Sequence, residues 1–168
     1  DFSGISAAYY GYQARYRAIP GDDPQAAVRW VGAASGNGNG QLEGKYNSQA
    51  ATDESRLWWD HLRRAGFVAG EGTRQPLNAL AGLVGVQNGD GGSPIGPVLD
   101  GFVGLMVCSA NLHDKVAIAV DGQIDDGVPR TGVVRGQLDT GPNPDIAVAA
   151  AFTYLETGAN VYTLCRAV

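Results

Sequence analysis

The sequence is poor in charge, and most of the charge that it has is negative. Of its 168 residues 17% are charged, with 12 lysines and arginines against 17 aspartates and glutamates, for a net charge of −5. Proteins that bind nucleic acid by neutralising phosphates carry the opposite sign, and the basic residues here are scattered. We therefore expect no nucleic-acid partner and no polybasic contact with a membrane surface.

Long apolar runs are missing too. No stretch reaches the ~18 apolar residues that can span a bilayer, and no secretory signal peptide is visible. The sequence begins at Asp1 rather than at a methionine. We expect it to be a processed or trimmed form.

Cysteine and histidine are scarce, with two of each. Two cysteines cannot complete a four-ligand zinc site, and Cys108 and Cys165 do not have CxxC spacing. They are either two separate buried thiols or one disulfide. The position of Cys165 near the C-terminus, where chains fray unless held, favours the disulfide and an extracytoplasmic location. His61 is interpreted as a surface or partly buried histidine. A Ser-His-Asp triad is the alternative, although no serine has the context of a hydrolase nucleophile.

What is present is typical of one globular domain. Hydrophobic residues make up 44% of the chain and glycines number 25, which indicates a substantial core with many loops and turns. No domain boundary is visible, so residues 1–168 are predicted to form a single domain. A helix at the start, followed by strands mixed with helix, predicts an α+β fold with an antiparallel sheet.

Residues 1–17 are predicted to form a helix that Pro20 and Gly21 end. Its apolar positions recur with helical spacing at Ile5, Tyr9, Tyr12 and Tyr16. Gly4 and Gly11 weaken it by about 1 kcal/mol each, and a short helix is marginal alone. We therefore interpret residues 1–17 as the second half of a longer helix whose beginning is missing.

Further elements follow from periodicity and end signals. Short helices are predicted for residues 25–31 and, after an N-cap at Thr52, for residues 53–65 with Gly66 at the C′ position. A strand is predicted for residues 98–108 and a terminal strand for residues 160–167. A helix is expected from Leu112 to Ile124, with Ser109 and Asn111 offering caps. Residues 35–44 and 70–96 are predicted to be mostly loop.

The densest acidic cluster is formed by Asp121, Asp125 and Asp126. Asp121 and Asp125 stand four residues apart on the predicted helix and repel each other. Arg130, Arg135 or a bound calcium ion, which prefers oxygen ligands, could compensate. The alternatives are a plain helix end running into an Asp-Gly turn, or a glycosidase-like acid/base pair.

The segment SGNGNGQLEG, residues 35–44, has the spacing of a calcium loop without its charges. Ser35, Asn37 and Asn39 occupy the first, third and fifth positions, and Tyr46 stands where the bidentate glutamate belongs. The glycines lack the flanking strand and helix of a phosphate-binding loop. We interpret this segment as a structural turn.

Trp58 and Trp59 are adjacent on a predicted helix. Their side chains diverge by about 100°, so at most one is expected at the centre of the core. Packing in the core and at its rim is the ordinary interpretation, and the alternative is that Trp58 or Trp59 faces a sugar or a partner, because exposed aromatic residues are enriched at interfaces.

Three stretches together resemble the type IV pilin and type II secretion pseudopilin superfamily, read without its N-terminal hydrophobic segment. They are YQARYRAIPGDDPQAA followed by GNGNG, then ESRLWWDHLRRAGFV, then CSANLHDKVAIAVDGQIDDGVPRTGVVRG ending in YTLC. The resemblance covers residues from about Gln13 to Cys165 in pieces. It rests on the order of the motifs along the chain.

The resemblance implies a filament subunit and no enzymatic activity. The N-terminal helix would lie on the sheet, with Gln13 and Arg17 facing neighbouring subunits, and a Cys108–Cys165 disulfide would close the C-terminal region. Partners would be other copies or other pilin-like subunits. The protein would be anchored in the inner membrane through the missing segment, before assembly in the periplasm or at the cell surface. The alternatives are a secreted carbohydrate- or partner-binding module and, third, an extracellular hydrolase.

Overall fold

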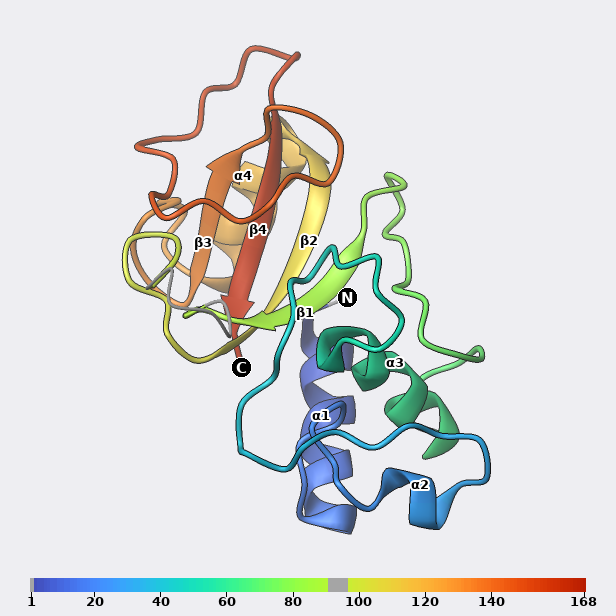
Figure 1. Cartoon of the computed structure of the whole chain (residues 1–168). Helices are drawn as coiled ribbons and strands as arrows, with labels where there is room; N and C mark the ends of the chain where they lie inside the picture. Colours follow the sequence, from blue (N-terminus) through green and yellow to red (C-terminus); the bar gives the residue numbers. More distant parts are fainter. Residues whose placement is uncertain (1, 91–96) are drawn as a thin grey trace.

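A computed structural model describes residues 2–90 and 97–168 of the chain. Asp1 and the end of the predicted loop 70–96 lie outside the described residues. The helices are α1 (Phe2–Tyr16), α2 (Ala26–Arg29), α3 (Glu54–Arg64) and α4 (Asp114–Ile124). The strands are β1 (Val84–Asn88), β2 (Leu105–His113), β3 (Val134–Leu138) and β4 (Val161–Ala167). Figure 1 shows α1, α2 and α3 grouped at one end of the molecule, and the sheet with α4 behind it at the other end.

The four strands form one antiparallel sheet in the order β1-β2-β4-β3, so the predicted α+β class is confirmed. Cys108 of β2 and Cys165 of β4 are direct cross-strand partners and are joined by a disulfide with an S–S length of 2.09 Å. The expected disulfide is therefore present. The predicted terminal strand is also confirmed, since β4 covers most of residues 160–167.

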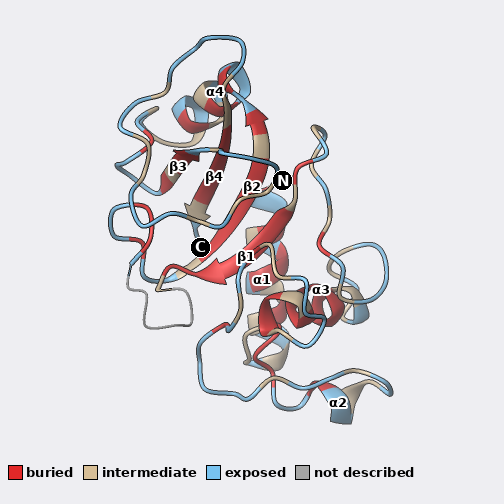
Figure 2. Cartoon of the chain, turned by 45° about the horizontal axis from the view of Figure 1, so that its top comes forward, coloured by how far each residue is buried: buried red, intermediate tan, exposed pale blue. Residues whose placement is uncertain are grey.

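The sheet has an apolar layer on each face, because successive side chains along a strand point to opposite sides. Met106, Cys108 and Ala110 of β2 belong to one buried cluster, together with Tyr46 and Leu99. The larger cluster on the other face contains Val107 and Leu112 of β2, and it extends to α1 and α3 through the buried side chains Phe2, Ile5, Tyr9, Tyr12, Trp58, Trp59 and Leu62. Figure 2 shows that burial follows this arrangement, with red concentrated in the sheet and in the faces of α1 and α3 that point inward.

The predicted strand 98–108 is wrong at both ends. Residues 98–104 form turns and an isolated bridge between Val98 and Phe102, and β2 runs on to His113. Ser109 and Asn111 therefore lie within β2 and do not cap a helix, which begins at Asp114. A bulge with Asn111 at φ 59° shifts the register of β2 and turns the Leu112 side chain into the core. Leu112 is therefore a buried strand residue, although its spacing also matched the predicted helix.

The helix α3 confirms the predicted end but not the predicted start. Its N-cap position is Asp53 rather than Thr52, and no side chain caps the first turn. At the other end, Phe67 N donates to Leu62 O and Gly66 N to Arg63 O, with Gly66 at φ 80°. This is the Schellman arrangement that favours glycine. It places the ring of Phe67 against Gly11 of α1, where an added Cβ would come within 2.8 Å of the ring.

The first helix is confirmed over Phe2–Tyr16. Ile5, Tyr9 and Tyr12 are buried as the spacing predicted, and Tyr9 stacks on Trp58 of α3 with ring centroids 5.3 Å apart. Within residues 2–90 and 97–168, no helix combines the length and apolar character needed to span a bilayer.

Candidate functional site

The exposed face of α1 carries unusually little polarity for a surface helix. Its exposed residues between Phe2 and Ala14 are Ser3, Gly4, Ala7, Tyr10 and Ala14, and Tyr10 leaves 55% of its surface in solvent. No residue from Phe2 to Ala14 is charged. Surface helices ordinarily have charged residues opposite their buried face. We call this set of five residues the neutral face of α1.

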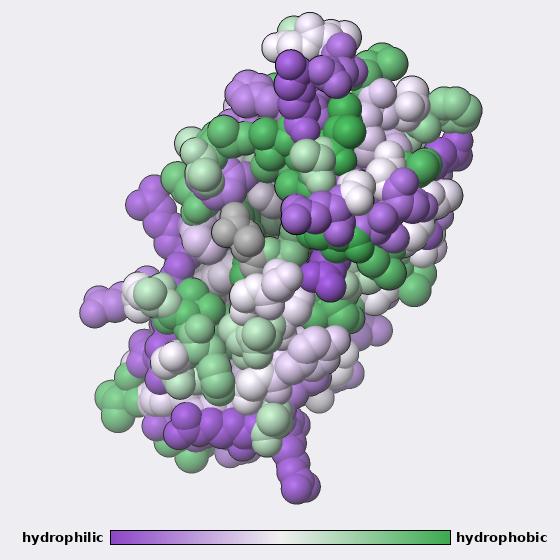
Figure 3. All heavy atoms as spheres, turned by 180° about the vertical axis from the view of Figure 1, so that it is seen from behind, coloured by the Kyte–Doolittle hydropathy of each residue, from purple (hydrophilic) through white to green (hydrophobic). Residues whose placement is uncertain are grey.

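Hydropathy varies over the surface of the molecule. Figure 3 views the molecule from behind Figure 1, and residues of intermediate hydropathy fill most of the lower middle, at the height of α1 in Figure 1. Charge appears only at the C-terminal end of α1, with Arg15 in its last turn and Arg17 just after it. Ser3, Gly4, Ala7 and Ala14 have small side chains and Tyr10 has the one large ring, so the face is uncharged over more than three turns.

Two mostly apolar grooves flank the N-terminal turns of α1. One has a volume of about 320 Å³ and is lined by Phe2 and Ser3 of α1, Leu112 of β2, and Val116 and Val120 of α4 among others. The second, of about 450 Å³, has Gly4 and Ile5 on one wall and Trp59, Phe67 and Leu77 among the residues opposite. A partner that covered the neutral face would thus meet apolar surface on both sides of it.

The predicted partner-facing residues divide into two groups. Arg17 is exposed and Gln13 is partly exposed, with its side chain donating to the Tyr9 hydroxyl at 2.7 Å. Trp58 and Trp59 are both fully buried, so the expectation that one of them faces a partner is wrong. Both indoles fit the core because α1 covers Trp58 while β1 lies beside α3, so this helix is covered on more than one side.

The loop that follows α2 is built around an aspartate of the PGDD segment. The Asp22 carboxylate is buried and accepts backbone hydrogen bonds from Gly38 at 2.6 Å, Asn39 at 3.1 Å and Gly40 at 2.8 Å. Glu54, at the start of α3, accepts two more from Asn37 and Glu43, and burial raises its pKa. The backbone amides of residues 37–40 are thus occupied by the chain's own carboxylates, and Gly36 N donates to Asp23 O, in agreement with a structural turn.

Gly36 shows how tightly this loop is packed, and we predict that Gly36→Ala destabilises the protein. A Cβ at residue 36 would lie 2.2 Å from Gly21 O and 2.4 Å from Asp22 Cα, both backbone atoms. Forcing these segments apart is expected to cost about 2 kcal/mol of unfolding free energy. Urea denaturation measures this, with Gly4→Ala as control because a Cβ there meets open space. Equal stability of Gly36→Ala and wild type would contradict the described packing.

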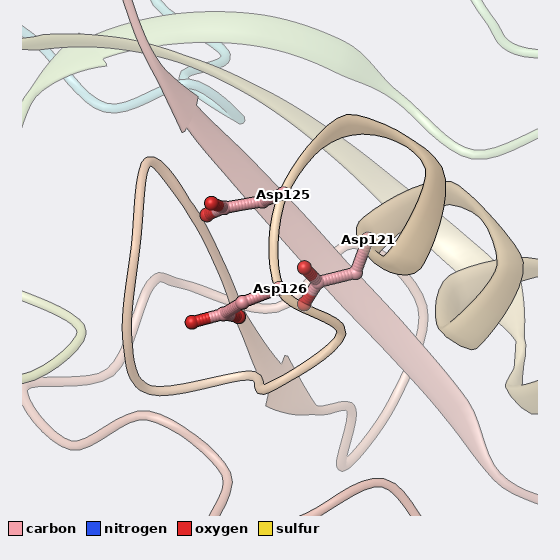
Figure 4. Close-up of side chains that lie close together, drawn as sticks. All are labelled: Asp121, Asp125 and Asp126. Atoms are coloured by element: carbon pink, nitrogen blue, oxygen red, sulfur yellow. The ribbon is translucent and has the colours of Figure 1, made fainter.

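The acidic cluster is also brought together. One oxygen from each of Asp121, Asp125 and Asp126 lies within 4.8 Å of the others. Figure 4 shows Asp121 projecting from the last turn of α4 and the other two from the turn that follows, with all three carboxylates on the same side of that turn. These are the groups in this region that could hold a cation such as calcium.

Most of these carboxylate oxygens already accept hydrogen bonds from the protein. Asp121 is fully buried and accepts from the Tyr154 hydroxyl at 2.5 Å and from Gly127 N at 3.1 Å. Asp125 accepts from Val134 N, and Asp126 from Val128 N and the Thr131 hydroxyl. The cluster therefore fixes the turn between α4 and β3 and, through Tyr154, the segment before β4.

The two arginines expected to compensate the cluster are engaged elsewhere. Arg130 pairs with Asp100 at 3.2 Å, and Arg135 donates to Leu99 O and Asp100 O. Burial raises the pKa of Asp121, and the neighbouring carboxylates Asp126 and Asp125 raise it further. The folded state therefore favours the protonated form of this carboxyl group.

This pKa shift predicts that Asp121→Asn stabilises the protein near neutral pH in the absence of divalent cations. A group with a raised folded pKa contributes stability that is present at low pH and is lost as pH rises through that pKa. The neutral amide removes this loss, and its oxygen can accept from Gly127 N while its NH2 group donates to the Tyr154 hydroxyl oxygen. The melting temperature should rise at pH 7 and match that of the wild type near pH 3. A calcium-dependent rise for the wild type that the variant lacks would instead assign the cluster to the cation.

Sequence reasoning missed Asp22, Asp23 and Glu54 as buried polar centres. Asp23 accepts a hydrogen bond from the Tyr12 hydroxyl at 2.6 Å and pairs with Arg29. The available signal was the adjacent pair Asp22-Asp23, separated from a glycine- and asparagine-rich loop only by a short helix, since carboxylates order such loops through their backbone amides.

No family model matches this chain, and searches of curated proteins and of solved structures find no match either.

Proposed function

We propose that this protein is a non-enzymatic filament subunit of the pilin or pseudopilin type, which assembles through α1. The observation that carries the proposal is the neutral face of α1, uncharged from Phe2 to Ala14. Small uncharged side chains let the backbones of two helices approach closely, as in helix interfaces that depend on close packing. A face of this kind on a soluble helix is best explained by a second helix that covers it.

In this proposal α1 continues a longer apolar helix that precedes Asp1 and anchors the subunit in a membrane before assembly. The buried side of α1 belongs to the same apolar cluster as Val84 and Val86 of β1 and Val107 of β2, and α1 packs on α3, which in turn contacts β1. The Cys108–Cys165 disulfide supports an extracytoplasmic location, because disulfides persist in oxidising compartments. Loops such as the one between β3 and β4 would be displayed outward.

Two alternatives gain less support from the fold. A glycan-binding module with Trp58 or Trp59 as its stacking platform requires an exposed indole, and both are fully buried. A hydrolase using Asp121 would need that carboxylate free for a substrate, whereas it accepts hydrogen bonds from Tyr154 and Gly127.

Site-directed photocrosslinking in cells tests the proposal. Cys108 and Cys165 are joined in the disulfide, so a cysteine introduced elsewhere in residues 2–90 or 97–168 is the one free thiol of this part of the chain. Ala7→Cys carrying a thiol-linked photoprobe is expected to give covalent adducts with further copies of this chain or with other pilin-like subunits. Thr140→Cys, in the exposed β3–β4 loop, serves as the matched control. If Ala7→Cys gave no more adduct than Thr140→Cys, the neutral face would not be an assembly surface.

A further inference from the structure

His61 is buried at the centre of the helical end of the molecule and holds two ends of one loop. Its ring is fully buried on α3. Nδ1 accepts a hydrogen bond from Gly21 N at 2.8 Å, and Nε2 lies 2.8 Å from Ala34 O. The two partners stand at the start and end of a segment, residues 21–34, that contains α2. One side chain thus fastens both ends of this segment to α3.

The partners of the ring fix its protonation state. A backbone N–H can only donate, so Nδ1 must carry a lone pair, and a carbonyl can only accept, so Nε2 must carry the proton. Adding a proton to Nδ1 would place two donors against each other at Gly21. The Gly21 hydrogen bond therefore requires a neutral imidazole.

The charged and titratable groups around the ring do not favour a second proton. Asp60 on α3 attracts a charged imidazole, but it pairs with Arg64 at 2.6 Å. Arg64 and Arg29 of α2 repel it, and Arg29 is paired with Asp23. The Tyr12 ring of α1 stacks on the imidazole with centroids 6.4 Å apart and excludes water from that side. Burial is the largest of these effects and lowers the pKa of His61 below the ordinary 6.5.

The fastened segment has little other apolar anchoring. Ala26 is buried and Trp30 is partly buried, whereas Val28 and Val31 are 80% and 99% exposed. The segment also has polar anchors, since Asp22 accepts from Gly38 and Gly40, Asp23 accepts from the Tyr12 hydroxyl of α1, and Arg64 of α3 donates to Val31 O and Gly32 O. Opening residues 21–34 therefore breaks these contacts too and frees Gly38 to Gly40, which makes it a local unfolding event of the loop.

We propose that His61 is an acid-sensitive latch, and that its protonation opens residues 21–34 while α3 and the sheet stay folded. The open state binds a proton at the ordinary histidine pKa of 6.5, whereas burial lowers the pKa of the ring in the closed state below that value. The closed state is therefore fully favoured above about pH 6.5 and becomes progressively less stable as pH falls below it. Opening would uncover the rings of Tyr12 and Trp30 near the C-terminal end of α1.

Hydrogen exchange detected by mass spectrometry tests the latch. Between pH 7.5 and pH 5, after correction for intrinsic exchange rates, the protection of peptides covering residues 21–34 should fall by up to about tenfold per pH unit below the histidine pKa. Peptides from α3 and β4 should keep their protection. Unchanged protection of residues 21–34 at pH 5, or simultaneous loss in β4, would overturn the proposal.

Variants and a ring titration identify the responsible group. His61→Asn can keep an acceptor toward Gly21 and cannot gain a proton, so its exchange should be independent of pH over this range. His113→Asn, at the exposed second histidine, should behave as wild type. If His61→Asn does not fold, nitrogen NMR of the wild-type ring decides. The ring and the Gly21 amide must then titrate with one common midpoint, and different midpoints would overturn the proposal.

Discussion

Ala7→Arg is expected to remove this protein from filaments while leaving its fold unchanged. Residue 7 is exposed on the neutral face, and arginine is a good helix former, so the isolated domain should lose little stability. In an assembled filament the guanidinium would be buried between helices without a partner. An unpaired buried charge costs about 3 kcal/mol or more, which corresponds to a contact weakened roughly a hundredfold.

The measurement is the amount of this chain in filaments sheared from cells that express the full-length protein. Ala159→Arg introduces the same side chain in the exposed loop before β4 and should leave that amount unchanged. Thermal melting of both purified variants shows whether the fold is retained. If Ala7→Arg assembled as well as Ala159→Arg, α1 would not be the surface through which subunits join.

Removing the disulfide by the double substitution Cys108→Ala and Cys165→Ala is expected to be the most destabilising change considered. The bridge joins residues 57 apart in sequence. A loop of that size confers about 4 kcal/mol in the chain-entropy model, against a total stability of about 5–15 kcal/mol for most domains. Both sulfurs also belong to the buried cluster formed with Met106 and Ala110, so truncation leaves a cavity there.

Urea denaturation of the oxidised wild type and the double variant measures this effect. The midpoint should fall strongly, and the dependence on urea concentration should increase, because the unfolded chain without the bridge expands and exposes more surface. In the double variant, β4 should be the strand that opens most easily, because it ends within three residues of Cys165. An average single substitution lowers the free energy of unfolding by about 1 kcal/mol. If the double variant lost less than that, the disulfide would add nothing to the stability that cross-strand packing provides.

The helices α1 and α3 could be predicted from the sequence, because local residue spacing and helix-ending residues determine them. The spacing of Ile5, Tyr9 and Tyr12 and the stop at Pro20-Gly21 place α1 correctly, and Gly66 ends α3 where its positive φ is needed. The sheet was harder. β1 and β3 have only five residues each and contain glycine and glutamine, so they show no alternating pattern, and they exist through pairing with β2 and β4.

The candidate sites show the same division between local and tertiary signals. The acidic cluster was found because Asp121, Asp125 and Asp126 are close in sequence as well as in space. The burial of both Trp58 and Trp59 was not predicted, because the sequence of one helix does not show how many other elements pack against it. The hydrogen bonds from Gly38 and Gly40 to Asp22 join residues that are 16 and 18 apart in sequence. Neither helical nor strand periodicity predicts contacts at such separations.

Determining the codons that precede Asp1 tests the central claim, that α1 is the second half of an assembling helix, most directly. The account predicts a short basic leader, then glycine and phenylalanine, then about twenty apolar residues that continue without a break into α1. A conventional cleavable signal peptide directly before Asp1, with no apolar helix retained in the mature chain, would contradict it.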